Sequence, residues 1–256
     1  MKNKLISFIL ISVLIFTLLI QAGASSTASS WYIKRNGNGT PTFSKDSKTV
    51  DNCNGYYIDK EAAKTGKKIL YLTFDAGYEN GNISNILDTL KKEKVPAAFF
   101  ILDNLVLKNT DLVKRMAEEG HAVCNHTKNH RNLIHCSKEE ITKNLSDLEK
   151  LYEEKTGYKM SKYFRFPEGK YNAETLEIVN KLGYTTVFWS FAYDDWDNER
   201  QPSAAKAMNK ILSNTHDGAV ILLHPTSKTN AEILPNLIKE WRAMGYTFGT
   251  LDELTK

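Results

Sequence analysis

The chain of 256 residues predicts an α/β protein built on a parallel sheet. Short apolar runs of strand length recur from Lys67 onward, helix-like patterns separate them, and no run is followed by a glycine-rich phosphate loop. The runs cover residues 69–74, 97–102, 121–124, 163–166, 185–189, 219–223 and 246–248. About seven strand–helix units fit an open doubly wound sheet or a barrel, and their number approaches the eight of a complete (β/α) barrel.

The segments between the runs have helix signals at their faces and ends. Ser137 and Glu140 form a capping box, and Gly157 closes the helix that they open. Apolar residues share one face across residues 83–90, as in an amphipathic helix. Further helices are predicted around residues 112–116, 176–182, 203–212 and 233–241, with Gly120, Gly183 and Gly245 as stop signals.

Residues 1–24 have the pattern of a cleavable secretory signal peptide. Lys2 and Lys4 precede an apolar run over residues 5–20, and the small residues 22–24 provide a cleavage site. The alternative is an uncleaved anchor, although the run is shorter than a typical membrane-spanning helix. No cysteine follows the run, so the sequence does not support a bacterial lipid anchor at this site. We therefore expect a secreted or extracytoplasmic protein.

The remaining chain divides into an N-terminal extension, residues 25–66, and one catalytic domain, residues 67–256. The extension is rich in Ser, Asn, Gly, Thr and Lys without sustained periodicity. We expect part of it to pack against the domain and part to be loose. The regular alternation of strands and helices begins only at Lys67.

Charge and cysteine content narrow the function classes further. The formal charge of +4 includes two lysines of the signal segment, so the mature protein is only mildly basic. This argues against nucleic-acid binding but allows weak attraction to an anionic cell wall. Cys53, Cys124 and Cys136 form neither a disulfide framework nor a zinc motif, which leaves core packing or one optional bridge. No stable protein partner is predicted.

Side chains capable of catalysis lie within or just after the ends of five predicted strands. They are Asp75, the pair His126 and His130, Arg165, the segment 194–197, and His224. In a parallel barrel, positions after strand ends face one mouth. Each alone has a structural explanation, such as a helix cap for Asp75 or a satisfied core histidine for His224. Five groups from five strands are hard to explain as chance caps.

His126 and His130 are four residues apart, so on a helical turn they would share a metal ion. The alternative is two exposed loop histidines, but the position at a strand end favours the metal. His224 at the edge of an apolar run suits a general acid, because imidazole titrates near neutral pH.

Arg165 belongs to an apolar run and needs an anionic partner if it is buried, for which Asp75 and Asp195 are candidates. Asp195 could also orient an imidazole, and the adjacent Trp196 offers an aromatic face for a sugar. The alternative is a loop aspartate followed by a packed tryptophan.

Taken together, these motifs resemble the polysaccharide deacetylase family, carbohydrate esterase family four. The matching stretches run in the family's order from Lys67 to the C-terminus: 73–75, 126–130, 165–169, 195–196 and 222–224. The resemblance implies a distorted, incomplete (β/α) barrel. It also implies metal-assisted removal of acetyl groups from N-acetylated sugars.

The resemblance assigns a role to each matching position. It implies that Asp75 is the general base and that Arg165 holds the carboxylate of this base. It implies that His224 is the general acid and that Asp195 tunes the imidazole of His224. His126 and His130 would be the metal ligands. It also implies substrate-binding roles for Trp196, Phe166, Pro167, Gly169 and Leu222. Amide hydrolysis needs an activated water, a polarised carbonyl and a proton for the leaving nitrogen, and these roles supply all three.

One position departs from the family pattern. A second aspartate usually follows the first and completes an Asp-His-His metal site, whereas this chain has Ala76. A divalent metal, expected to be zinc, then needs another donor from water, substrate, Glu79, Asn80 or Asp75 itself. The loss of an anionic ligand should weaken binding and metal discrimination.

Two local stretches, residues 76–81 and 189–196, are similar to the spore-cortex deacetylases that form muramic δ-lactam. This similarity implies peptidoglycan glycan strands as the partner and N-acetylmuramic acid as the substrate, with lactam closure in some members. Arg165, Lys128 or Lys170 would then contact the lactyl carboxylate. The alternatives are an N-acetylglucosamine deacetylase acting on peptidoglycan or chitooligosaccharide, and a catalytically silent wall-binding module.

Overall fold

The computed structural model describes residues 27–256, so the predicted signal peptide at residues 1–24 lies outside the described part. Its centre is an eight-stranded sheet in the order β11-β5-β6-β7-β8-β10-β4, and β12 also pairs with β5. Each pairing between these strands is parallel. The strands are β4 (Gly55–Tyr56), β5 (Ile69–Ala76), β6 (Ala97–Ile101), β7 (Ala122–Asn125), β8 (Ser161–Phe164), β10 (Thr185–Val187), β11 (Ala219–Leu223) and β12 (Thr247–Phe248).

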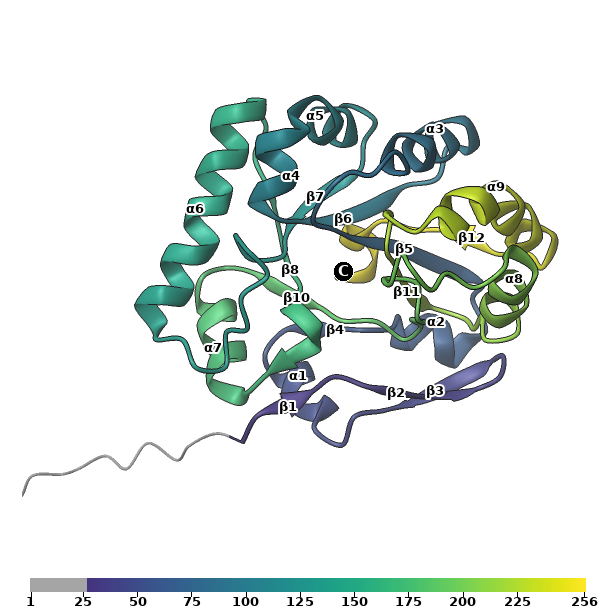
Figure 1. The fold of residues 1–256 in the computed structure, drawn as a ribbon. Helices are drawn as coiled ribbons and strands as arrows, with labels where there is room; N and C mark the ends of the chain where they lie inside the picture. Colours follow the sequence, from purple (N-terminus) through teal and green to yellow (C-terminus); the bar gives the residue numbers. More distant parts are fainter. Residues whose placement is uncertain (1–26) are drawn as a thin grey trace, which may run out of the picture.

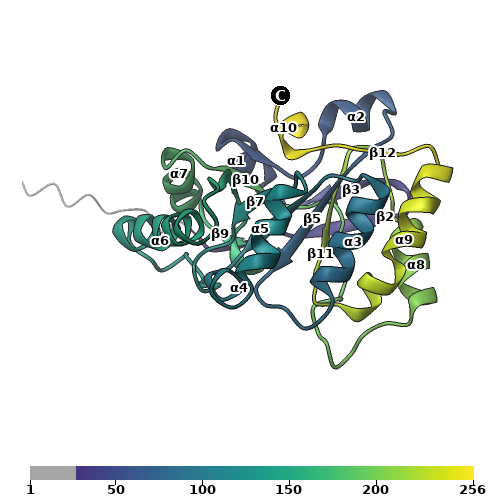
Figure 2. The same ribbon diagram turned by 90° about the horizontal axis from the view of Figure 1, so that it is seen from above.

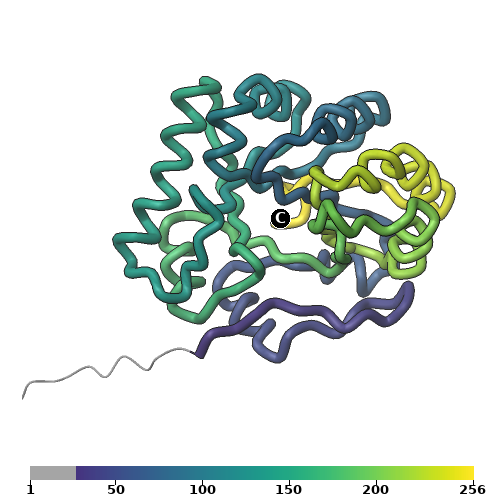
Figure 3. The backbone as a smooth tube through the Cα atoms, in the orientation of Figure 1, coloured from purple at the N-terminus to yellow at the C-terminus, as the bar shows by residue number. Residues whose placement is uncertain are grey.

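The sheet curls into a distorted, incomplete barrel, which confirms the predicted fold class (Figure 3). Each of the seven predicted runs contains a parallel strand, and β4 adds an eighth. Single bridges from Ile58 to Ala219 and from Phe191 to Ile221 connect the two ends of the strand order. The seam of the barrel is therefore irregular, and it is made by loops rather than by a full ladder of strand pairs.

Helices surround the sheet on its outer side (Figure 1). They are α1 (Ser47–Asn52), α2 (Lys60–Thr65), α3 (Ile83–Glu93), α4 (Asp103–Lys108), α5 (Thr110–Glu118), α6 (Lys138–Thr156), α7 (Ala173–Lys181), α8 (Ala204–Leu212), α9 (Lys228–Ala243) and α10 (Leu251–Leu254). The predicted capping box opens α6, and Gly157 ends that helix in the left-handed conformation. Helices α2 and α10 lie at one end of the barrel (Figure 2). No helix within residues 27–256 could cross a membrane.

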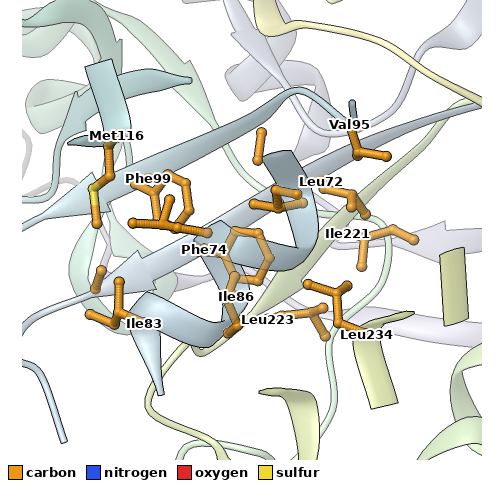
Figure 4. Close-up of a cluster of buried hydrophobic side chains, with 14 of the residues drawn as sticks. Leu72, Phe74, Ile83, Ile86, Val95, Phe99, Met116, Ile221, Leu223 and Leu234 are labelled. Carbon is orange, nitrogen blue, oxygen red and sulfur yellow. The ribbon is translucent and has the colours of Figure 1, made fainter. Parts of the chain in front are cut away.

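Strand β5 is buried on both faces, which explains its continuous apolar sequence. Its residues Leu70, Leu72, Phe74 and Ala76 pack with side chains of the outer helices in the main core cluster. Figure 4 shows this cluster around Leu72 and Phe74, with α3 and α9 contributing apolar side chains. Because alternate residues point to opposite faces, Asp75 points away from this cluster, toward the barrel interior.

The segment 27–66 packs closely on the barrel and supplies more than β4. Its first strand, β1 (Ser29–Ser30), pairs with β9 (Lys170–Tyr171), and β2 (Ile33–Asn36) forms a hairpin with β3 (Gly39–Phe43). The hairpin runs along one side of the barrel (Figure 1). The sequence did not predict these strands, because they are two to five residues long and lack an alternating apolar pattern.

The three cysteines are unbridged. Cys124 is buried in β7, and Cys53 and Cys136 are partly exposed. Both Cys53 and Cys136 pack against an apolar cluster of the core.

Candidate active site

Asp75 and Arg165 form an ion pair at the carboxyl end of the sheet. Arg165 follows β8 directly and is completely buried, and its Nη1 donates to Asp75 Oδ1 over 2.8 Å. Its other donors bind Thr73 Oγ1 at 2.9 Å and the Val187 carbonyl at 2.8 Å. The guanidinium also lies over the Phe100 ring, 4.1 Å from its centroid. With its hydrogen bonds satisfied, Arg165 holds the Asp75 carboxylate in one orientation.

The surroundings keep Asp75 ionised. Burial alone would raise the pKa of Asp75, but His126, Arg165 and His224 outweigh that effect and hold it below its ordinary value. Because burial lowers the pKa of His126 to about 4, that ring is neutral at pH 7. Arg165 is therefore the permanent positive partner of the carboxylate.

His126 presents one ring nitrogen to Asp75. Its Nδ1 lies 2.8 Å from the Arg165 carbonyl oxygen, which can only accept a hydrogen bond. In the neutral ring Nδ1 therefore carries the hydrogen and Nε2 has the free lone pair. Nε2 lies 3.5 Å from Asp75 Oδ2. A backbone carbonyl that fixes a tautomer in this way is typical of histidines that ligate metals.

His130 lies beside His126, but not on a helical turn as predicted. The two rings have centroids 5.0 Å apart and planes at 72°. The connecting segment is a loop in which Thr127 and His130 both have positive φ angles, 70° and 58°. Such backbone conformations in non-glycine residues cost energy and often occur at functional sites. The loop brings the rings together where a helix was expected.

The side chains of Asp75, His126 and His130 are of the types that bind a divalent cation, although they supply fewer ligands than is usual. Two imidazoles and a carboxylate suit zinc. However, no group of three or more His, Cys, Asp or Glu side chains within residues 27–256 has the arrangement of a metal site. Glu79 binds the backbone amide of Ile83, and Asn80 binds the Thr226 carbonyl. Of the suggested extra donors, Asp75 is thus the one beside His126.

His224 directly follows β11, the strand next to β5, and is held by the fully buried Asp195. Asp195 Oδ1 lies 2.7 Å from His224 Nδ1, and Asp195 Oδ2 accepts the His224 backbone amide at 2.8 Å. Asn230 of α9 donates to the same carboxylate over 2.6 Å. Burial alone would lower the pKa of His224, but Asp195 outweighs it and the pKa is raised. The imidazolium of His224 therefore persists to higher pH than that of an ordinary histidine.

These groups surround one cavity of about 810 Å³. Asp75, His126, His130 and His224 line it together with apolar and aromatic side chains. Trp196 is 59% exposed at the cavity, so its ring face is available to a ligand. Apolar walls around a few convergent polar groups are the usual form of a ligand site.

The structure separates the predicted substrate-binding residues into two groups. Trp196 and Leu222 line the cavity, whereas Phe166, Pro167 and Gly169 are buried and do not line it. Phe166 belongs to an apolar core cluster. Gly169 has φ +64°, and a Cβ there would come within 2.9 Å of the Trp189 ring. Close packing against Trp189 explains why this position is a glycine. Gly169 therefore packs behind Trp189, which is itself a residue of the cavity wall.

Three of the functional side chains around the cavity could not be found by sequence reasoning. Tyr78 and Arg35 line it, and Asn230 holds Asp195 from α9. Tyr78 follows the glycine after β5, which is the one local signal among them. Neither Lys128 nor Lys170 lines the cavity. Lys128 Nζ lies 3.6 Å from Asp147, and Lys170 pairs with Glu168.

Comparison with known proteins agrees with this geometry. The family model Polysaccharide deacetylase matches residues 62–187. The chain is 34% identical over 226 residues to peptidoglycan-N-acetylmuramic acid deacetylase PdaA of Bacillus subtilis, across 88% of this chain and 84% of that protein. It is 32% identical over 195 residues to a peptidoglycan-N-acetylglucosamine deacetylase of Bacillus cereus, across 74% and 89%.

The fold is also similar to a solved structure. The structure of B. subtilis PdaA, described as a family 4 carbohydrate esterase, superposes with a TM-score of 0.84 at 34% identity. The match covers 89% of this chain and 96% of that one. The sequence motifs, the curled barrel and these matches lead to the same conclusion: this chain belongs to the polysaccharide deacetylase family.

Proposed function

We propose that this protein is an extracytoplasmic deacetylase that hydrolyses the N-acetyl group of N-acetylmuramic acid in peptidoglycan. The observation that carries the proposal is the presence of two held side chains at one cavity, Asp75 held by Arg165 and His224 held by Asp195. A silent wall-binding module has no use for both pairs. The same geometry also serves N-acetylglucosamine, so the sugar must be decided by other features.

Asp75 is the general base in this proposal. A water molecule next to its carboxylate gives up a proton as its oxygen attacks the acetyl carbonyl carbon. Arg165 keeps the carboxylate ionised and directed at the cavity. The base therefore needs no reorganisation when the reaction begins.

His224 is the general acid. Its Nδ1 is engaged by Asp195, so Nε2 is the atom that gives a proton to the leaving nitrogen. Asp195 itself is positioned by Asn230 and by the His224 backbone amide. The acid thus lies beside the base, because β11 and β5 are neighbouring strands whose ends pair at Leu223 and Phe74.

His126 and His130 would hold the divalent metal, with Asp75 adjacent. A bound metal of this kind polarises the acetyl carbonyl and lowers the pKa of a ligating water. Zinc suits the two imidazoles best, and the small number of protein ligands leads us to expect weak, exchangeable binding.

N-acetylmuramic acid is favoured over N-acetylglucosamine by the extent of the similarity to PdaA, which spans both chains almost fully. Residues 76–81 and 189–196 resemble the spore-cortex enzymes, and this resemblance supports the spore cortex as the layer in which the protein acts. The predicted signal peptide would carry the protein across the membrane.

Mass spectrometry of muropeptides tests the proposal and its metal requirement together. Purified protein with added zinc should remove one acetyl group per N-acetylmuramic acid, and treatment with a chelator should abolish the activity until metal is returned. Fragmentation identifies which sugar has lost its acetyl group. Loss from N-acetylglucosamine alone would favour the alternative deacetylase, and no loss with any divalent metal would favour a silent module.

Asp195→Asn should move the basic limb of the pH–rate profile to lower pH. The raised pKa of His224 keeps the imidazolium present to higher pH, and Asp195 is what raises it. Without the carboxylate the pKa falls, so the protonated acid is lost earlier as pH increases. The measurement is kcat/KM against pH, with Asp197→Asn as the matched control, since Asp197 binds Arg200 instead. An unchanged basic limb in Asp195→Asn would exclude His224 as the acid.

A further inference from the structure

We propose that Arg35, on the N-terminal hairpin, recognises the lactyl carboxylate of N-acetylmuramic acid and so selects this sugar. The inference rests on the proposed function and adds a specificity-determining residue to it. Arg35 lies in β2, outside the residues that carry the acid, the base and the histidine pair. It nevertheless lines the same cavity as Asp75 and His224.

The hairpin that carries Arg35 is fixed to the barrel at both ends. Before β2, Trp31 is buried, its ring stacks on Phe188 at 4.8 Å, and its Nε1 donates to the Trp189 carbonyl over 2.9 Å. At the turn, Asn38 Nδ2 donates to the Leu212 carbonyl over 2.9 Å. Anchors on both sides of a four-residue strand leave Arg35 little freedom of backbone position.

Arg35 and its neighbour Lys34 differ in their position relative to the cavity. Ile33 and Arg35 line the cavity, whereas Lys34 between them does not. Only one of these two neighbouring cationic residues therefore lies at the cavity. This difference provides a matched pair for mutation.

The Arg35 guanidinium is held in place with donors to spare. Nη2 donates to the Ala192 carbonyl over 2.5 Å, and the Cζ atom lies 5.8 Å from the Phe191 ring centroid. A guanidinium has five N–H donors, and within residues 27–256 this is the single hydrogen bond that the Arg35 side chain makes. No carboxylate of the described chain lies within ion-pair distance of it.

Arg35 is also the one lysine or arginine that lines the cavity within residues 27–256. Arg165 is buried and forms an ion pair with Asp75. Glu168, an acidic residue that lines the cavity, forms an ion pair with Lys170. A substrate carboxylate entering the cavity therefore has one permanent cation to meet. The planar fork of arginine matches a carboxylate with two parallel hydrogen bonds.

The chemistry of the two candidate sugars explains why a carboxylate matters. N-acetylmuramic acid carries a lactyl ether on O3, next to the carbon that bears the acetamido group, and N-acetylglucosamine carries a hydroxyl there. When the acetamido group reaches Asp75 and His224, the lactyl group must lie in the same cavity. An arginine on the cavity wall distinguishes the sugars by this substituent alone.

The test compares two forms of one substrate. Glycan strands freed of stem peptides provide the lactyl carboxylate, and coupling the same strands to methylamine converts it to a neutral amide. Wild-type protein should prefer the carboxylate form. Arg35→Gln should lose about 10-fold in kcat/KM on that form, mainly through KM, and should match wild type on the amide. Arg35→Lys should keep part of the preference.

Lys34→Gln is the control, because it removes the same charge one residue away and should behave as wild type on both strands. Arg35 is exposed, so thermal unfolding of Arg35→Gln should be unchanged. Equal wild-type rates on the two forms, an intact preference in Arg35→Gln, or an equal loss in Lys34→Gln would overturn the role of Arg35. No turnover of either form would instead contradict the proposed function itself.

Discussion

Asp75→Asn is expected to lower kcat/KM for deacetylation by about 10²- to 10⁴-fold, the range of a lost general base. Asparagine keeps the size of the side chain and can still accept from Arg165 through its amide oxygen. It cannot take a proton from water. The loss should therefore lie in kcat, with glycan binding nearly preserved. Steady-state kinetics on stem-free strands measures both quantities.

The same variant should also change how stability depends on pH. The pKa of Asp75 is lower in the folded protein than its ordinary value of 3.8, so its ionised form stabilises the fold above that pH. This stabilisation disappears as pH falls through the lowered pKa. Asp75→Asn should flatten this acid-side part of the unfolding curve. Wild-type activity in Asp75→Asn would remove Asp75 as the base, whatever the stability data show.

The sequence was most informative where the apolar pattern of one strand predicts both that the strand is buried and where the polar residue after it lies. The apolar run of β5 predicts a buried strand, and the next polar residue then has to lie at the sheet edge, as Asp75 does. His224 after β11 follows the same rule. These positions depend on contacts within one strand and its neighbours. Such contacts require a periodic apolar pattern in the sequence, and this pattern can be recognised before the structure is known.

Other features depend on contacts between distant segments and leave no local pattern. His126 and His130 were expected on a helical turn, but two left-handed residues place them on a loop. Phe166 follows Arg165 directly, yet the two side chains are buried in different surroundings, one in the apolar core and the other against Asp75. Adjacency in a motif therefore did not reveal which residues meet the substrate.

Arg35 illustrates the limit most clearly. Its position depends on a bond from Trp31 to Trp189 and another from Asn38 to Leu212, across 158 and 174 residues of sequence. Residues 25–66 were expected to pack against the domain only in part, because their strands are too short for periodicity. Only the folded structure shows that this segment forms one wall of the cavity.

Arg165→Met is expected to destabilise the fold by about 3–5 kcal/mol, because removing one partner of a buried ion pair leaves the other charge uncompensated. Arg165 is completely buried, and the Asp75 side chain is 11% exposed. For a chain of this size the loss lowers the melting temperature by about 10 °C. Denaturant unfolding measures it, and Arg200→Met, at an arginine whose side chain is 81% exposed, should leave the free energy of unfolding unchanged.

The double variant Asp75→Asn with Arg165→Met separates the ion pair from the packing of the arginine. If the cost of Arg165→Met comes from the stranded Asp75 charge, neutralising that charge should recover about 1–3 kcal/mol relative to the sum of the single variants. If the cost comes from lost bonds to Thr73 and Val187, the two variants should add. Activity stays at the low level of Asp75→Asn in either case, because the base is gone. A strict sum would thus reduce Arg165 to a packing residue and leave the orientation of Asp75 without its proposed cause.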